Sequence, residues 1–223
     1  SQVTDYKTGD RVVAEPHALA CGSCALCRQG KMQICPHKRS PGWGIDGAFT
    51  DYLVMPALLL HRIPDGLSYE RAALAEPMAI TVHQVAERAR IDCQDFVVVT
   101  GAGPIGIMAA FVAKAMGAGR VVVTGMDSCE FIRFDVARAL GADDIINVQK
   151  EDPVALIMDW TGGRGADVVI ETSGAGPAIA QAVDLVKKTG RISAIGISQK
   201  EMVNFPWNKA IYKVIDLLFN MSS

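Results

Sequence analysis

The sequence FVVVTGAGPIG at residues 96–106 places a β-branched apolar run directly before three glycines in the pattern G-x-G-x-x-G, namely Gly101, Gly103 and Gly106. An apolar segment with helical spacing follows to residue 117. Between a strand and a helix, the first glycine permits a tight turn, the second lets a pyrophosphate approach the backbone, and the third lets the helix pack on the sheet. The segment therefore predicts a dinucleotide site that includes Pro104 and Ile105. The alternative is an ordinary glycine-rich turn.

The rest of the C-terminal half alternates short β-branched runs with longer helical ones. This pattern predicts a doubly wound parallel sheet of the Rossmann type, with helices on both faces. Asp152 and Pro153 fit a helix N-cap and first-turn proline, and Gly117, Gly141 and Gly190 fit helix ends. The predicted strands are residues 96–100, 120–124, 144–148, 166–173 and 191–197; the predicted helices are 105–117, 129–141, 152–162 and 177–190.

The carboxyl ends of parallel strands are where dinucleotides lie, so residues there are predicted cofactor contacts. An acid that binds the adenine ribose is expected about 20 residues after the turn, where Gly125 stands instead. Asp127 and Arg133 follow, and either ribose diol or 2′-phosphate recognition stays open, so the sequence does not choose between NAD and NADP. At the fourth and fifth strands the predicted contacts are Thr172, Ser173, Ile195, Gly196 and Ile197.

The N-terminal third has a different texture, with short apolar runs, many turns and clustered cysteines. It predicts antiparallel β-structure with loops. We expect two domains, residues 1–76 and 77–223, joined by a helical segment at residues 69–89.

Four cysteines within fifteen residues, spaced C-x2-C-x2-C-x7-C, predict a zinc site. An iron–sulfur cluster, disulfides or unrelated thiols are the alternatives. A four-cysteine zinc site has no open coordination position, so it is structural rather than catalytic. The predicted ligands are Cys21, Cys24, Cys27 and Cys35.

The composition excludes few classes of protein. Half of the 223 residues are hydrophobic and the net charge is −2, so no basic surface for nucleic acid is expected. The longest uncharged run, residues 96–113, contains glycines and a proline and is expected to be a strand, turn and helix rather than a membrane span. No export signal is visible, and clustered thiols then indicate a reducing compartment, the cytoplasm.

Together these motifs make the chain similar to the zinc-containing medium-chain dehydrogenases of alcohols, polyols and threonine. The resemblance lies in "GDRVVAEPHALACGSCALCRQGKMQIC", "DGAFTDYLVMPALLLHRIPDGLSYERAALAEPMAITVHQV", "TGAGPIG" and "PWNKAIYK". It implies a partial GroES-like catalytic domain, a structural zinc on the four cysteines, and Glu76 as a ligand of a catalytic zinc or its near neighbour. It also implies a small secondary alcohol as substrate, a polyol or an amino alcohol, and NAD or NADP as cofactor. The apolar segment 214–223 is expected at the sheet edge, where the family pairs subunits, so a homodimer or homotetramer is implied.

The family's catalytic zinc also needs a cysteine and a Gly-His-Glu segment before "GDRV", and this sequence starts just before that point. We therefore expect the chain to be the middle of a longer enzyme. The alternative is a non-catalytic NAD(P)-binding module with structural zinc only. A zinc-free quinone reductase of the same fold is a weaker option, because the cysteine lobe and Glu76 argue against it.

Overall fold

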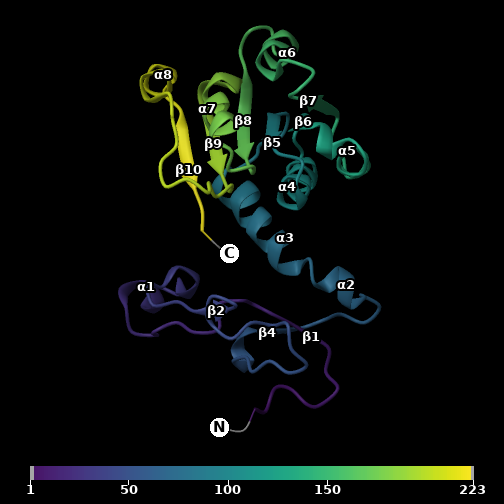
Figure 1. The fold of residues 1–223 in the computed structure, drawn as a ribbon, viewed down its shortest axis with the longest axis vertical. Helices are drawn as coiled ribbons and strands as arrows, with labels where there is room; N and C mark the ends of the chain where they lie inside the picture. The colour runs from purple at the N-terminus through teal and green to yellow at the C-terminus, as the bar shows by residue number, and fades with distance from the viewer. Residues whose placement is uncertain (1–2, 222–223) are drawn as a thin grey trace. The chain divides into compact units, whose positions relative to one another are not determined.

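The computed structural model describes residues 3–221, which form two compact units. The first unit contains residues 3–77 together with Met221, and the second contains residues 78–220. Figure 1 shows the fold of the chain, coloured by residue number.

The second unit is built on a six-stranded, all-parallel sheet, which confirms the predicted Rossmann fold. The strand order β10-β9-β8-β5-β6-β7 is that of a doubly wound sheet. The chain adds β6 and β7 on one side of β5 and then places β8, β9 and β10 on the other side, so the strand order reverses between β5 and β8. The strands are β5 (Phe96–Thr100), β6 (Arg120–Gly125), β7 (Asp144–Asn147), β8 (Ala166–Glu171), β9 (Val186–Ala194) and β10 (Asp216–Phe219).

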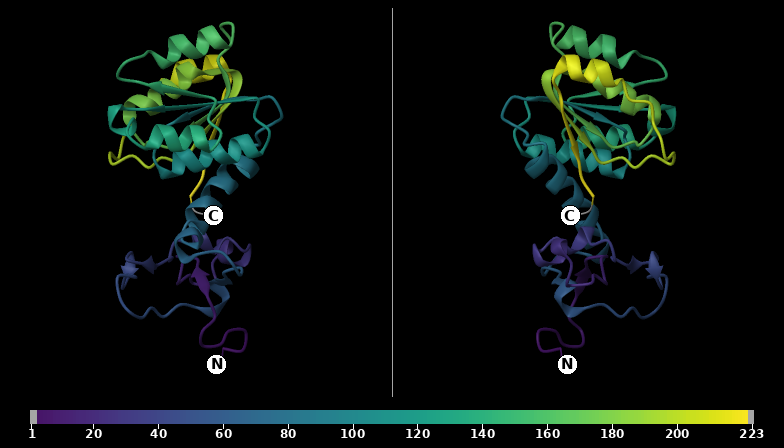
Figure 2. Two further views of the ribbon diagram at one scale, coloured as in Figure 1. Left: turned by 90° about the vertical axis from the view of Figure 1, so that its right-hand side faces the viewer. Right: turned by 90° about the vertical axis from the view of Figure 1, so that its left-hand side faces the viewer.

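Helices cover both faces of this sheet (Figure 2). The alternating residues of β5 explain why: Val97 and Val99 pack toward one core with α4 (Pro104–Ala115) and α5 (Arg133–Ala139), whereas Val98 packs toward the other. That second core contains residues of α6 (Pro153–Trp160), α7 (Gly176–Leu185) and α8 (Trp207–Lys213). A strand buried on both faces reads as a continuous apolar run, as "FVVVT" does.

Several helix ends follow the predicted local chemistry. The Asp152 carboxylate accepts from the N–H groups of Val154 and Ala155, and Pro153 is the first residue of α6. Gly117 and Gly141 adopt positive φ after α4 and α5. The predicted helix at residues 129–141 is shorter than expected, because a 3₁₀ turn at Asp127–Cys129 precedes α5.

The prediction of a helix up to Gly190 is wrong. α7 ends at Leu185, and the chain enters β9 at Val186, which is buried opposite Ala166 of β8. Lys187 then forms an ion pair with Asp167, and Gly190 lies within the strand rather than in a left-handed cap. Burial of Val186 and pairing of Lys187 therefore override the helical pattern.

The first unit has little regular structure. β1 (Val12–Ala14) and β4 (Leu60–Arg62) pair antiparallel, and β2 (Ser40–Pro41) pairs with β3 (Gly44–Ile45). The apolar run at residues 52–55 forms no strand, and Tyr52 and Val54 are exposed. The short helices are α1 (Ala25–Arg28), η1 (Met32–Ile34) and η2 (Ala57–Leu59).

The predicted helix at residues 69–89 forms in three pieces. They are α2 (Tyr69–Ala72), α3 (Ala75–Val82) and a π-helical segment, η3 (His83–Arg88). Within η3 the side chain of Gln84 is buried and donates to Ser193 Oγ (2.6 Å) and to the Leu218 carbonyl (3.2 Å). This amide therefore ties η3 to β9 and β10.

None of the helices within residues 3–221 has the length and apolar character that crossing a membrane requires.

Candidate dinucleotide and metal sites

The glycine turn brings the start of α4 against the end of β5. Gly101 has φ +117°, and its N–H donates to the Thr124 carbonyl of β6 (3.1 Å). A Cβ at Gly106 would lie 1.8 Å from the Gly101 carbonyl oxygen. These two positions therefore need glycine for the packing of the chain itself.

Gly103 is different. Its φ of −77° and ψ of 175° suit any residue, and a Cβ placed there would meet nothing within 4 Å. Neither conformation nor packing within the described chain requires glycine at this position. The glycine leaves open space directly at the first turn of α4, where the N–H groups of Ile105 and Gly106 have no helical partner. Pro104 is the first residue of that turn.

The predicted contacts from β8 and β9 gather at the same sheet edge. Thr172 follows β8, and its N–H and hydroxyl both donate to the Thr100 carbonyl (3.1 and 3.0 Å). Its hydroxyl also reaches the Gly101 carbonyl (3.2 Å). The predicted contacts lie one to three residues beyond the strands, since β8 ends at Glu171 and β9 ends at Ala194.

Glu171 is a residue that the sequence analysis missed. It is only 2% exposed, and its Oε1 accepts from the N–H groups of Ser173 (2.9 Å) and Gly174 (3.1 Å) and from the Ser173 hydroxyl. Its backbone carbonyl accepts from the N–H groups of Ile195 (2.8 Å) and Gly196 (3.0 Å). One residue thus holds the loops after β8 and β9 together. The available signal was an acid directly after the apolar run at residues 168–170.

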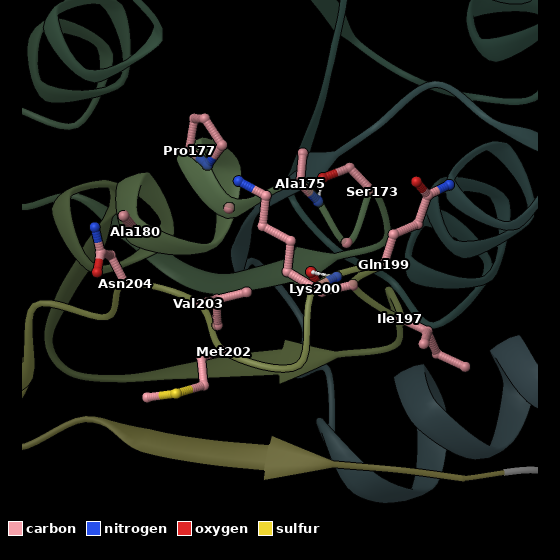
Figure 3. A pocket seen from close by; sticks show the side chains of 13 residues that line it. Ser173, Ala175, Pro177, Ala180, Ile197, Gln199, Lys200, Met202, Val203 and Asn204 are labelled. Atoms are coloured by element: carbon pink, nitrogen blue, oxygen red, sulfur yellow. Dashed lines mark hydrogen bonds between the residues drawn. The ribbon is translucent and has the colours of Figure 1, made fainter.

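A pocket of about 830 Å³ opens beside these loops (Figure 3). Ser173 and Ile197, both predicted cofactor contacts, line it. The side chain of Lys200 extends across it toward Ala175 and Pro177 at the start of α7. The pocket therefore reaches these two predicted contacts, whereas the glycine turn at residues 101–106 does not line it.

The predicted ribose residues lie at the end of β6. Gly125 is the last residue of that strand, and a Cβ on it would lie 3.1 Å from the Cβ of Ala102 in the glycine turn. Asp127 begins the following 3₁₀ turn, and Arg133 is the first residue of α5. The structure therefore places Gly125 beside the turn and the other two residues on the segment that follows it.

The four clustered cysteines converge. Their sulfur atoms all lie within 4.8 Å of one another. Individual Sγ–Sγ distances are 3.6 Å for Cys21–Cys35, 3.9 Å for Cys21–Cys27 and 4.0 Å for Cys24–Cys35. Four sulfurs at 2.3 Å around a tetrahedral zinc would stand about 3.8 Å apart. The geometry is therefore consistent with structural zinc, and all six cysteines of the chain are free rather than disulfide-bonded.

Hydrogen bonds from backbone N–H groups favour the thiolate form of Cys21, which is the form that binds a metal cation. Hydrogen bonds from the N–H groups of Ser23 and Cys24 lower the pKa of the Cys21 thiol to about 5. Loss of hydration, with hydrogen bonds to the Cys24 and Cys35 thiols, raises the pKa of Cys27 to about 12. A metal that binds here finds Cys21 ionised at neutral pH and displaces a proton from Cys27.

Glu76 lies in the first turn of α3 and is half-buried. Among residues 3–221 the four-cysteine cluster is the one group of three or more His, Cys, Asp or Glu side chains placed to share a metal ion. The described residues therefore do not assemble a second metal site around Glu76.

Two family models match the chain. The model of the zinc-binding dehydrogenase family matches residues 104–221, more than half of the 223 residues, and that of the alcohol dehydrogenase GroES-like domain matches residues 1–65. The chain belongs to the zinc-containing medium-chain dehydrogenases. This finding confirms the predicted family and the GroES-like character of the first unit.

Characterised relatives and solved structures agree with the family. The chain is 39% identical over 220 residues to sorbitol dehydrogenase of Halalkalibacterium halodurans, covering 99% of this chain and 63% of the relative. It is 38% identical over 218 residues to L-threonine 3-dehydrogenase of Deinococcus deserti, covering 97% of this chain and 61% of the relative. A protein of Sinorhizobium meliloti 1021, provisionally described as a zinc-binding dehydrogenase and bound to NADP, superposes with a TM-score of 0.90 at 26% identity, covering 99% and 64%. The chain thus spans about three-fifths of the length of these curated relatives.

The first prediction concerns Glu171. In Glu171→Gln the amide oxygen can still accept from the Ser173–Gly174 turn in place of Oε1. The N–H₂ group then faces the Gly174 N–H, which lies 3.2 Å from Oε2 in the parent chain, and the remaining hydrogen bonds lose the carboxylate charge. Hydrogen bonds to charged groups contribute about 1.5–3 kcal/mol, so we expect unfolding to become easier by about that amount. At a temperature where the variant is fully folded, its affinity for a nicotinamide dinucleotide should also fall about tenfold, as measured by calorimetry. Glu87→Gln, an exposed acid on η3, is the control. Equal dinucleotide affinity in the folded Glu171 variant would contradict a positioning role.

The second prediction concerns the thiol cluster. Cys35→Ser removes the buried member of the four, and we expect it to lower the zinc content by one equivalent per chain and to unfold residues 19–39, because folding and metal binding are coupled in such lobes. Zinc is measured by atomic absorption. Cys93→Ser, at an exposed cysteine of the second unit, should retain all of it. Unchanged zinc in the Cys35 variant would rule out the four-cysteine site.

Proposed function

We propose that the protein containing this chain is a zinc-dependent oxidoreductase that transfers hydride between a secondary alcohol and NAD or NADP. Support comes from the matched families and from relatives that act on sorbitol and L-threonine, a polyol and an amino alcohol. The domain boundary would fall at residues 76 and 77. The enzyme would work in the cytoplasm as a homodimer or homotetramer joined along β10, the end strand of the sheet.

The observation that carries the proposal is the open space at Gly103. Gly101 and Gly106 are explained by packing within the chain, whereas Gly103 is not. A glycine that the fold does not need, at the amino end of a helix and at the reversal point of a parallel sheet, is explained by a pyrophosphate close to the backbone.

The chain's own residues would orient the cofactor. The turn at Gly101, Gly103, Pro104, Ile105 and Gly106 would receive the pyrophosphate. The loops after β8 and β9 would lie along the nicotinamide half, with Thr172, Ser173, Ile195, Gly196 and Ile197 as contacts. Glu171 would keep these two loops in register, and their side chains would exclude water from one face of the ring.

The zinc ions have separate places in this proposal. Cys21, Cys24, Cys27 and Cys35 would hold a structural zinc that closes the lobe. Glu76 is proposed as one ligand of a catalytic zinc, which as a Lewis acid lowers the pKa of the bound alcohol. Among residues 3–221, Glu76 belongs to no group of three or more His, Cys, Asp or Glu side chains placed to share an ion.

Two glycine variants with opposite expectations test the dinucleotide site. Gly103→Val should leave the free energy of unfolding within about 1 kcal/mol of the parent value, the scale of an N-cap change, because nothing lies within 4 Å of the new Cβ. Its affinity for NADH and NADPH should fall more than about tenfold in fluorescence titrations, and turnover of sorbitol or threonine should fall with it.

Gly106→Ala is the contrasting variant. It should destabilise the fold by about 1–3 kcal/mol, because its Cβ collides with the Gly101 carbonyl. If Gly103→Val binds both dinucleotides as tightly as the parent protein, the proposed pyrophosphate position is wrong.

A further inference from the structure

The corner of the site at the end of β6 has no room for an acid at Gly125. A Cβ on Gly125 would lie 2.6 Å from Cε1 and 3.0 Å from Cζ of Phe134, and 3.1 Å from the Cβ of Ala102. Phe134 is buried in the core between the sheet and α4, so its ring cannot swing away without loss of packing. The position from which a carboxylate usually binds the adenine ribose diol is therefore closed by the ring of Phe134.

The next acids along the chain are engaged elsewhere. Asn147 Nδ2, at the end of β7, donates to Asp127 Oδ1 (2.7 Å) and to Glu130 Oε1 (2.6 Å). Lys150 Nζ lies 2.7 Å from Glu130 Oε1 and 3.7 Å from Asp127 Oδ1. Hydrogen bonds from Lys150 and Asn147 lower the pKa of Glu130. Both carboxylates thus belong to a network that faces β7 rather than the glycine turn.

Arg133 is the remaining charge of this corner. It directly precedes Phe134, whose ring covers Gly125, and it is exposed. Within residues 3–221 its side chain makes no hydrogen bond or ion pair, unlike Arg138 of the same helix, which pairs with Asp135 (3.0 Å). Its guanidinium is therefore available to an anion at this corner.

We propose that this corner accepts the 2′-phosphate of NADP, with Arg133 as the residue that binds it. The inference rests on the proposed function, since it concerns the adenine-ribose end of the same cofactor. Without a free carboxylate, this corner offers no acceptor for a hydrogen bond from the 2′-hydroxyl of NAD, and it does not repel a phosphate. Asp127 and Glu130 are already paired with Lys150 and Asn147. The guanidinium of Arg133 is therefore left for the phosphate, which it can bind in a bidentate manner. The chain therefore binds NADP at least as tightly as NAD.

Fluorescence titration of the full chain with NADPH and with NADH tests this. We expect NADPH to bind at least as tightly as NADH. Arg133→Ala should weaken NADPH about tenfold or more while NADH changes less than about twofold, because only NADPH carries the phosphate. Arg138→Ala removes the same charge from the same helix and should leave the ratio of the two affinities unchanged.

A second variant tests recognition of the ribose diol of NAD separately from recognition of the 2′-phosphate of NADP. Asp127→Asn should leave the NADH affinity within about twofold of the parent value, because Asp127 is held by Asn147 and not by ribose. A large loss of NADH binding in this variant, or equal losses of both dinucleotides in Arg133→Ala, would overturn the inference. So would a parent protein that binds NADH at least about tenfold more tightly than NADPH. These outcomes leave the proposed function standing, whereas failure of both dinucleotides to bind the parent protein would remove it as well.

Discussion

The close approach of Gly106 to the Gly101 carbonyl is the contact on which the arrangement of the site depends. A single Cβ at Gly106 would lie 1.8 Å from that oxygen, so α4 can begin this near to β5 only if no side chain intervenes. The approach directs the free N–H groups and the positive dipole end of α4 to the carboxyl ends of the neighbouring strands β5 and β8. The loops after β6, β8 and β9 then meet at the same edge, because the carboxyl ends of parallel strands share it.

The two units are stabilised in different ways. The second unit has two continuous apolar cores, one on each face of the sheet, and uses buried polar groups such as Glu171 only where loops must be fixed. The first unit has few fully buried apolar side chains and only short strands. Small lobes with little core commonly depend on a metal, and the converging sulfur atoms at residues 21–35 supply the ligands for one. Zinc binding would therefore contribute to folding there, while packing suffices for the sheet.

Much of the parallel sheet could be predicted from the sequence because β5, β6, β7 and β8 are rich in β-branched residues and end at recognisable turns. The cysteine lobe was predictable for a similar reason, since spacing alone brings four thiols together. The end of α7 was not predictable from its own pattern, because the chain leaves the helix to bury Val186 against Ala166 and to pair Lys187 with Asp167. Glu171 was missed because its partners lie in two loops that only the fold brings together. The ring of Phe134 over Gly125 is a tertiary contact of the same kind.

Amide hydrogen exchange across residues 101–107, followed by mass spectrometry with and without a saturating nicotinamide dinucleotide, tests the central claim most directly. A pyrophosphate that accepts hydrogen bonds from the first turn of α4 should slow exchange there, and peptides from α6 should not change. Exchange at residues 101–107 that is unaffected by a dinucleotide shown to be bound would contradict the account.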